Sequence, residues 1–243
     1  MVNTKSAIRK VARNGPAKER MISISSFFTT LQSYCFYMMP ANVKLSKNEL
    51  ALVCDEQFIL TKNNIIDKVY KLFGLLSIEF TKELEHTTIS KDTEIFHSAP
   101  KIYKGEQYKS LPYVMLDHPR CFNKDDAFAI RCFFWWGNFF SITLHLSGKF
   151  SNHYASKIIN SIHNSKLHAE WYYCISETQW QHDFEPGNYE IFSKILNLES
   201  TESITQKSFF KIAKKISLSE WDDVHDFYTS NFREILKMLE SEA

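Results

Sequence analysis

The stretch of sequence that decides the fold is LPYVMLDHPRCFNKDDAFAIRCFFWWGNFFSITLHLSGKF, residues 111–150. Two apolar runs in it flank the pair Gly137-Asn138. Such a pair between apolar runs is typical of a two-residue hairpin turn, because glycine tolerates the positive φ that the turn requires. Residues 127–136 and 139–146 are therefore predicted to form one antiparallel hairpin.

A two-residue turn also fixes which side chains share a face of the hairpin. The predicted pairs are Trp136 with Phe139, Phe134 with Ser141, Cys132 with Thr143, and Ile130 with His145. One face then carries Ala129, Arg131, Phe133, Trp135, Phe140, Ile142, Leu144 and Leu146 and is predicted to be the main core. The other face is mixed, with aromatic residues from the first strand and Ser141, Thr143 and His145 from the second. We expect it to be partly covered by a helix or to form the floor of a binding cleft.

Arg131 is the most informative single residue of this stretch. On the predicted core face its guanidinium would be buried, and a buried guanidinium requires a carboxylate or another anion. Asp117 of the preceding strand would supply a structural ion pair. Alternatively, a ligand carboxylate or phosphate would be held by two parallel hydrogen bonds. The candidate ligand-binding residues are therefore Asp117, Arg131, Trp136, Thr143 and His145.

Composition indicates a packed domain with an unusual N-terminal segment. The chain has 243 residues, and 44% of them are hydrophobic, which is ample for a core. Residues 1–42 are basic and polar, lack an apolar period, and are predicted to form a mobile extension. Residues 43–243 are predicted to form a single α+β domain. Because 29 Lys and Arg face 28 Asp and Glu, nucleic acid is not expected as a partner.

Cysteine usage and hydropathy bear on the compartment. The five cysteines are an odd number without paired spacing, which favours the reducing cytoplasm. No apolar run is long enough for a transmembrane helix, so no membrane association is expected. The sequence does not indicate an oligomeric state.

The order of the predicted elements gives the fold class. Helices are predicted for residues 46–58, 62–84, 152–164, 205–216 and 219–239, and strands for a short stretch near Ile102, residues 111–117, the hairpin and residues 171–177. Helices, antiparallel strands and helices in this order indicate an α+β fold, with a small antiparallel sheet built on the central hairpin and helices packed on one or both faces.

Common catalytic and cofactor motifs do not occur. Gly148-Lys149 resembles the end of a phosphate-binding loop, but Thr143 stands where its first glycine belongs and Phe150 where Ser or Thr belongs. The six glycines form neither GxGxxG nor GxSxG, and the chain has no HExxH and no CxxC. We therefore expect no cofactor and no metal, although Asp117-His118 and His182-Asp183 could converge as a His/carboxylate cluster.

Four phrases of the sequence carry a resemblance. They are residues 58–63 (FILTKN), 111–117 (LPYVMLD), 135–140 (WWGNFF) and 144–148 (LHLSG). With these phrases, residues 43–200 resemble an uncharacterised family of bacterial proteins. The resemblance implies no activity and adds no functional residue.

Two main hypotheses for the function follow, beside a third in which the basic N-terminal segment associates with nucleic acid. The first is a cytosolic ligand-binding or interaction protein that uses the mixed face of the hairpin to hold a small anionic ligand. The second is an enzyme whose acid and base groups come from Asp117, His118, His145 and His182. Catalysis requires at least two of these groups within hydrogen-bond reach of one site, whereas a binding face requires Trp136, Thr143 and His145 to be exposed together.

Overall fold

The computed structural model describes residues 43–87, 94–95, 98–164 and 170–240. The chain divides into two compact units, residues 1–58 and 59–243. The predicted basic extension, residues 1–42, lies outside the described residues. In the first unit, α3 (Lys47–Val53) begins with the capping box expected from the sequence. The Ser46 N–H donates to Glu49 Oε2 at 2.7 Å, and the Glu49 N–H donates to Ser46 Oγ at 3.2 Å.

The second unit is built on a seven-stranded antiparallel sheet with the strand order β1-β2-β3-β4-β7-β5-β6. Its strands are β1 (Lys101–Tyr108), β2 (Leu111–Phe122), β3 (Ala127–Trp135), β4 (Phe139–Ser147), β5 (Tyr172–Cys174), β6 (Tyr189–Ile191) and β7 (Phe209–Ser217). The helices that follow α3 are α4 (Glu56–Glu85), whose first three residues belong to the first unit, α5 (Lys149–Asn164), α6 (Phe192–Leu198), α7 (Thr201–Thr205), the 3₁₀ helix η2 (Leu218–Asp223) and α8 (Val224–Glu240). The predicted α+β class with an antiparallel sheet is confirmed.

The central hairpin forms, but its predicted register is wrong by one residue. Trp135, not Trp136, pairs with Phe139, and Arg131 pairs with Thr143. The loop therefore contains three residues, Trp136-Gly137-Asn138, with Gly137 at φ +73°. A glycine with positive φ suits a three-residue hairpin loop as well as a two-residue one, so the turn signal alone does not fix the register.

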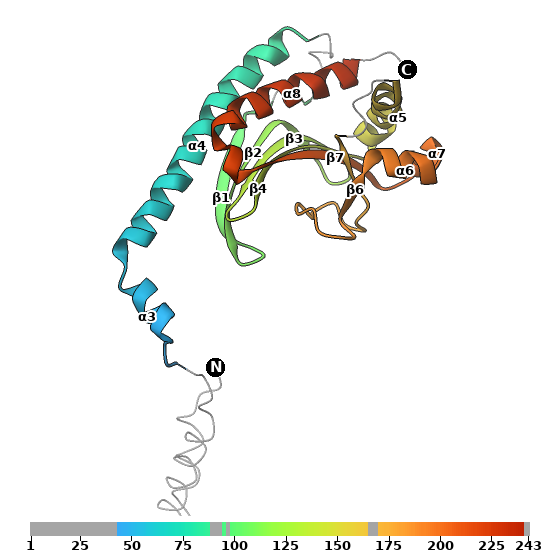
Figure 1. The fold of residues 1–243 in the computed structure, drawn as a ribbon. Helices are drawn as coiled ribbons and strands as arrows, with labels where there is room; N and C mark the ends of the chain where they lie inside the picture. Colours follow the sequence, from blue (N-terminus) through green and yellow to red (C-terminus); the bar gives the residue numbers. More distant parts are fainter. Residues whose placement is uncertain (1–42, 88–93, 96–97, 165–169, 241–243) are drawn as a thin grey trace, which may run out of the picture. The chain divides into compact units, whose positions relative to one another are not determined.

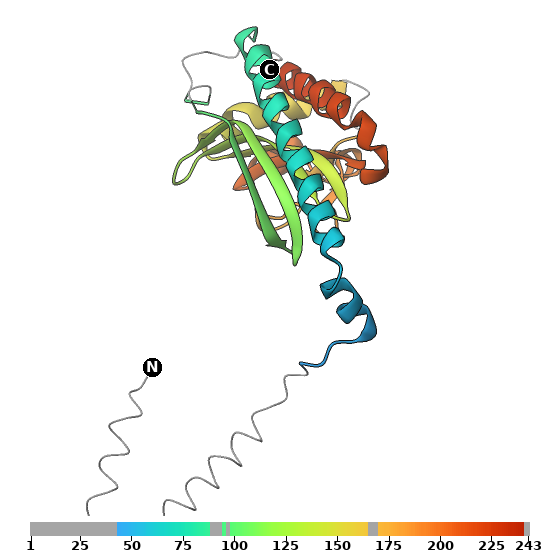
Figure 2. The same cartoon turned by 90° about the vertical axis from the view of Figure 1, so that its left-hand side faces the viewer.

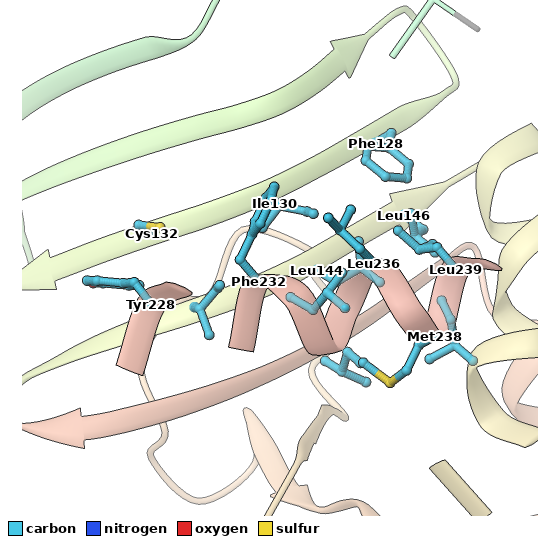
Figure 3. Close-up of a cluster of buried hydrophobic side chains, with 14 of the residues drawn as sticks. Phe128, Ile130, Cys132, Leu144, Leu146, Tyr228, Phe232, Leu236, Met238 and Leu239 are labelled. Carbon is cyan, nitrogen blue, oxygen red and sulfur yellow. The ribbon is translucent and has the colours of Figure 1, made fainter. Parts of the chain in front are cut away.

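The corrected register moves the core to the other alternating set of β3 residues. The core side of the hairpin carries Phe128, Ile130, Cys132 and Phe134 from β3, with Phe140, Ile142, Leu144 and Leu146 from β4. Figure 3 shows several of these side chains meeting α8, which contributes Tyr228, Phe232, Leu236, Met238 and Leu239. Arg131 therefore lies on the opposite face, with the polar residues of β4.

Helices cover this core side of the sheet. In Figure 1, α4 and α8 both lie above the sheet, and in Figure 2 α4 runs along it beside α8. The buried stripe of α4 is Ile66, Val69, Phe73, Leu76, Phe80 and Leu84, close to the predicted spacing. The two helices meet where the rings of Phe80 and Phe232 stack with centroids 3.7 Å apart.

The C-terminal region departs furthest from the predicted elements. The helix predicted for residues 205–216 is wrong over most of its length, because residues 209–217 form β7, which inserts between β4 and β5.

Two strands ahead of the hairpin are longer than predicted. The predicted strand 111–117 continues to Phe122 through a register shift between Asp117 and Arg120. The short strand expected near Ile102 is the eight-residue β1. These strands form because hydrogen bonds to neighbouring strands override local preference.

Candidate functional site

The face of the sheet opposite α4 and α8 carries a group of polar side chains, here called the polar cluster. Its members are Asp117 of β2, Arg131 of β3, Thr143 and His145 of β4, Lys211 of β7, and His182 from the connection between β5 and β6. Strand pairing brings them together, because Asp117 is the partner of Arg131, Arg131 of Thr143, and His145 of Lys211. All five sheet residues are buried.

Apolar patches border the polar cluster on both sides. Toward β1 lie Met115, Phe133 and Trp135, and toward β6 lie Cys174, Tyr189, Phe209 and Ala213. The low polarity of these surroundings strengthens every electrostatic interaction inside the cluster.

Arg131 and Asp117 form a bidentate ion pair. Arg131 Nε donates to Asp117 Oδ1 at 2.6 Å, and Nη2 donates to Oδ2 at 2.9 Å. Tyr103 adds a hydrogen bond to Oδ2 at 3.3 Å, and Arg131 Nη1 lies 3.4 Å from His182 Nε2. The structure thus contains the ion pair that the sequence suggested, although on the face opposite to the predicted one.

Lys211 has a different environment, because its ammonium group is held by main-chain oxygens. Nζ donates to the carbonyl of Gln179 at 3.0 Å and to that of Gln181 at 2.5 Å. Among the described residues, no carboxylate forms a salt bridge with Lys211. Burial, with a smaller contribution from the charge of Arg131, lowers the pKa of Lys211 to about 7.

His145 lies beside Lys211 and is completely buried. Its Nε2 is 2.7 Å from Oε1 of Gln179. Burial and the nearby charge of Lys211 lower the pKa of His145 to about 3, so the ring is neutral at pH 7. Burial also lowers the pKa of His182 well below its ordinary value, and Lys211 and Arg131 act in the same direction.

Residues 175–188, here called the cover segment, connect β5 to β6 and lie across the polar cluster on the side away from α4 and α8 (Figure 1). The hydroxyl of Tyr108 is its main anchor. This hydroxyl accepts from the N–H of His182 at 2.7 Å and from that of Asp183 at 3.1 Å, and it donates to Asp183 Oδ2 at 2.7 Å. Asp183 also forms an ion pair with Lys109 at 3.1 Å.

Three buried polar atoms on this face have no hydrogen-bond partner within the described parts of the chain. They are Nδ1 of His145, the hydroxyl of Tyr189 and the hydroxyl of Ser141, which shares the polar face of β4 with Thr143 and His145. Burial raises the pKa of the Tyr189 hydroxyl well above its ordinary value, against the charge of Arg131, which lowers it. Because buried polar groups are normally paired, these three atoms mark where a ligand could form hydrogen bonds.

The structure gathers some of the predicted site residues and separates others. Asp117, Arg131, Thr143 and His145 share the polar cluster, but Thr143 and His145 are buried, so the expected exposed face with Trp136 does not exist. Trp136 packs instead against the core on the helix side, 6.4 Å from the ring of Phe134.

The residues of the enzyme hypothesis are also divided. His118 Nε2 lies 3.0 Å from Oγ1 of Thr81 in α4, on the helix-covered side of the sheet. Asp117, His145 and His182 remain on the polar side, with Asp117 already paired to Arg131.

Sequence reasoning missed Lys211, Gln179 and Tyr189. Lys211 was missed because its segment was predicted to be a helix. The same segment also shows the alternation of a strand, in which the apolar Phe210 and Ile212 alternate with Phe209, Lys211, Ala213 and Lys215. No local signal marks Gln179 or Tyr189, since they reach the cluster only through the path of the cover segment and β6.

Within the described ranges, no three His, Cys, Asp or Glu side chains lie where they could hold a metal ion. The same part of the chain contains no helix with the length and hydropathy needed to cross a membrane. Comparison with protein-family models, curated proteins and solved structures finds no match. The resemblance to a bacterial family stays a prediction.

Proposed function

We propose that this protein binds a small oxyanion, a carboxylate or a phosphate, at the polar cluster beneath the cover segment. The site presents mainly hydrogen-bond donors, namely the Arg131 guanidinium, the Lys211 ammonium and the Tyr189 hydroxyl. Donors next to fixed positive charge in a buried setting favour a ligand that is negatively charged and rich in acceptors. The free thiols of Cys54, Cys121, Cys132 and Cys174 support a reducing compartment such as the cytoplasm.

One observation carries the proposal: among the described residues, the buried ammonium of Lys211 forms no salt bridge with a carboxylate, and only the more distant charge of Asp183 partly offsets it. Asp117 is engaged by Arg131, and Asp183 is engaged by Lys109. Lys109 is also paired with Glu185 at 2.8 Å. Of the three cations Lys109, Arg131 and Lys211, only Lys211 therefore has no salt bridge to a described residue. Burial of an uncompensated charge is unfavourable, and a bound anion would remove that cost.

The pKa of Lys211 supports the same conclusion. With a pKa of about 7, the neutral amine form of Lys211 is already accessible at neutral pH. An anion beside Nζ would stabilise the ammonium form and raise this pKa, so anion binding and proton uptake should be linked.

The test is a thermal-shift and calorimetric screen against inorganic phosphate and a series of small carboxylic acids at pH 6.5. A ligand at 100 times its dissociation constant should stabilise the protein by about 2.7 kcal/mol. Lys211→Met should abolish that stabilisation. Lys215→Met is the matched control, because Lys215 is an exposed lysine on the same strand and the same face.

The proposal fails if no compound of the screen stabilises the wild-type protein. It also fails if Lys211→Met and Lys215→Met respond to the anion equally, because surface charge would then explain the effect.

A further inference from the structure

We infer that the ligand is a hydroxy acid, whose hydroxyl group donates a hydrogen bond to Nδ1 of His145. This inference rests on the proposed anion site and narrows its ligand class. It follows from the tautomer of one buried histidine and from the charges that surround it.

The contact with Gln179 fixes the tautomer of His145. Its Nε2 lies 2.7 Å from Oε1 of Gln179, and a carbonyl oxygen can only accept, so Nε2 carries the proton. A neutral imidazole has one N–H and one lone pair. Nδ1 is therefore an acceptor.

The surroundings keep Nδ1 an acceptor. The ring is 0% exposed, and burial together with the charges of Lys211 and Arg131 disfavours a second proton. Within the described residues, no donor reaches Nδ1. Lys211, the strand partner of His145, directs its ammonium hydrogens to the carbonyls of Gln179 and Gln181.

The missing donor is better supplied by a hydroxyl group than by an amine. An amine on a small acid is an ammonium at pH 7, and Lys211 and Arg131 would repel its charge. A hydroxyl group is neutral. It also has lone pairs for the unpartnered Tyr189 hydroxyl on the same face. A site with cationic donors for the acid group and a neutral acceptor beside them thus matches a hydroxy acid.

The experiment compares pairs of acids that differ only by a hydroxyl group. The pairs are glycolate with acetate, lactate with propionate, malate with succinate, and glycerol phosphate with propyl phosphate. Titration calorimetry on the wild-type protein should show about tenfold tighter binding of the hydroxylated member of the pair that fits, the effect of one hydrogen bond of about 1.4 kcal/mol.

Two variants connect the preference to Nδ1. His145→Gln places an amide where Nε2 lies and removes Nδ1, so it should bind both members of a pair equally. His145→Asn places its amide near the position of Nδ1 and should restore part of the preference. In the wild-type protein, the ¹⁵N chemical shifts of the His145 ring should show that Nε2 is protonated and that Nδ1 is not.

The outcomes separate this inference from the proposed function. Equal binding within every pair, with Lys211→Met still abolishing it, would overturn the hydroxy-acid inference and leave the anion site intact. Nδ1 would then be paired with water alone. A protonated Nδ1 in the spectrum would also overturn the inference. Binding of no acid would refute the proposed function, and the inference with it.

Discussion

At the scale of single residues, the energetics of this protein depend on charges placed where water cannot reach them. Arg131 is 4% exposed and Asp117 is 3% exposed, and two hydrogen bonds join their side chains. A pair of this kind contributes little net stability compared with apolar residues, but removal of one partner leaves a buried charge alone.

We therefore expect the ion pair to behave as a unit in a double-mutant cycle. Arg131→Met or Asp117→Val alone should lower the free energy of unfolding by about 3 to 5 kcal/mol. The double variant should cost clearly less than either single change, because it leaves no unpaired charge. Urea unfolding at pH 7 measures all four proteins, and additive costs would show that the two side chains do not depend on each other.

Lys211 should make stability depend on pH in the alkaline range. Its pKa is lowered from 10.5 to about 7 in the folded protein, so between these values the unfolded chain binds more protons. Stability then rises with pH across this window. Wild-type protein should gain stability relative to Lys211→Met between pH 7 and pH 9. Urea midpoints that differ by the same amount at both pH values would contradict this, and Lys215→Met should follow the wild type.

At the scale of elements, the cover segment is held in place mainly through the end of β1. Tyr108 is the last residue of that strand, and its hydroxyl forms three hydrogen bonds to the segment. The ring lies in the apolar patch with Phe133 and Trp135, at centroid distances of 5.5 and 5.2 Å. Packing thus fixes the ring, and the hydroxyl fixes the main chain of His182 and Asp183.

Tyr108→Phe should loosen the cover segment while the sheet stays folded. Loss of the hydroxyl leaves two partly buried N–H groups without their acceptor, at a cost of about 1 kcal/mol or more. Amide hydrogen exchange of His182 and Asp183 should become faster, and exchange in β3 and β4 should not change. Tyr70→Phe, at an exposed position of α4, is the control. Unchanged exchange at both amides would show that other contacts hold the segment.

At the scale of the whole molecule, the core is shared between the sheet and long helices that are distant in sequence. The α4 stripe begins at Ile66, and its rings meet α8, whose Tyr228 hydroxyl reaches the carbonyl of Phe133 at 3.1 Å. Every buried hydrophobic residue of the described chain lies at or after Ile66.

Deletion of residues 1–38 should therefore change the melting temperature by less than about 5 °C. For a domain of this size, a larger shift would correspond to more than about 1 kcal/mol. Differential scanning calorimetry of the full and shortened chains makes the comparison. A larger drop would mean that the deleted residues contribute to the core.

The sequence by itself determined the elements whose signals are local. The capping box of Ser46 and Glu49, the stripes of α4 and α8, and the existence of the β3–β4 hairpin all follow from spacings of a few residues. The pairing of Arg131 with Asp117 was one of two alternatives that the sequence left open, beside a ligand anion, because a buried guanidinium requires an anion and Asp117 stands on the neighbouring strand.

Only the tertiary structure decided the register, the identity of β7 and the composition of the site. Hairpin loops of two and of three residues have similar sequence signals. The register of β3 with β4 therefore depends on how β3 pairs with β2 and packs on α8. Residues 209–217 become a strand because β4 and β5 offer hydrogen bonds on both sides. That pairing places Lys211 beside His145. Because these residues are far apart in the sequence, no periodic pattern of the sequence indicates their contact.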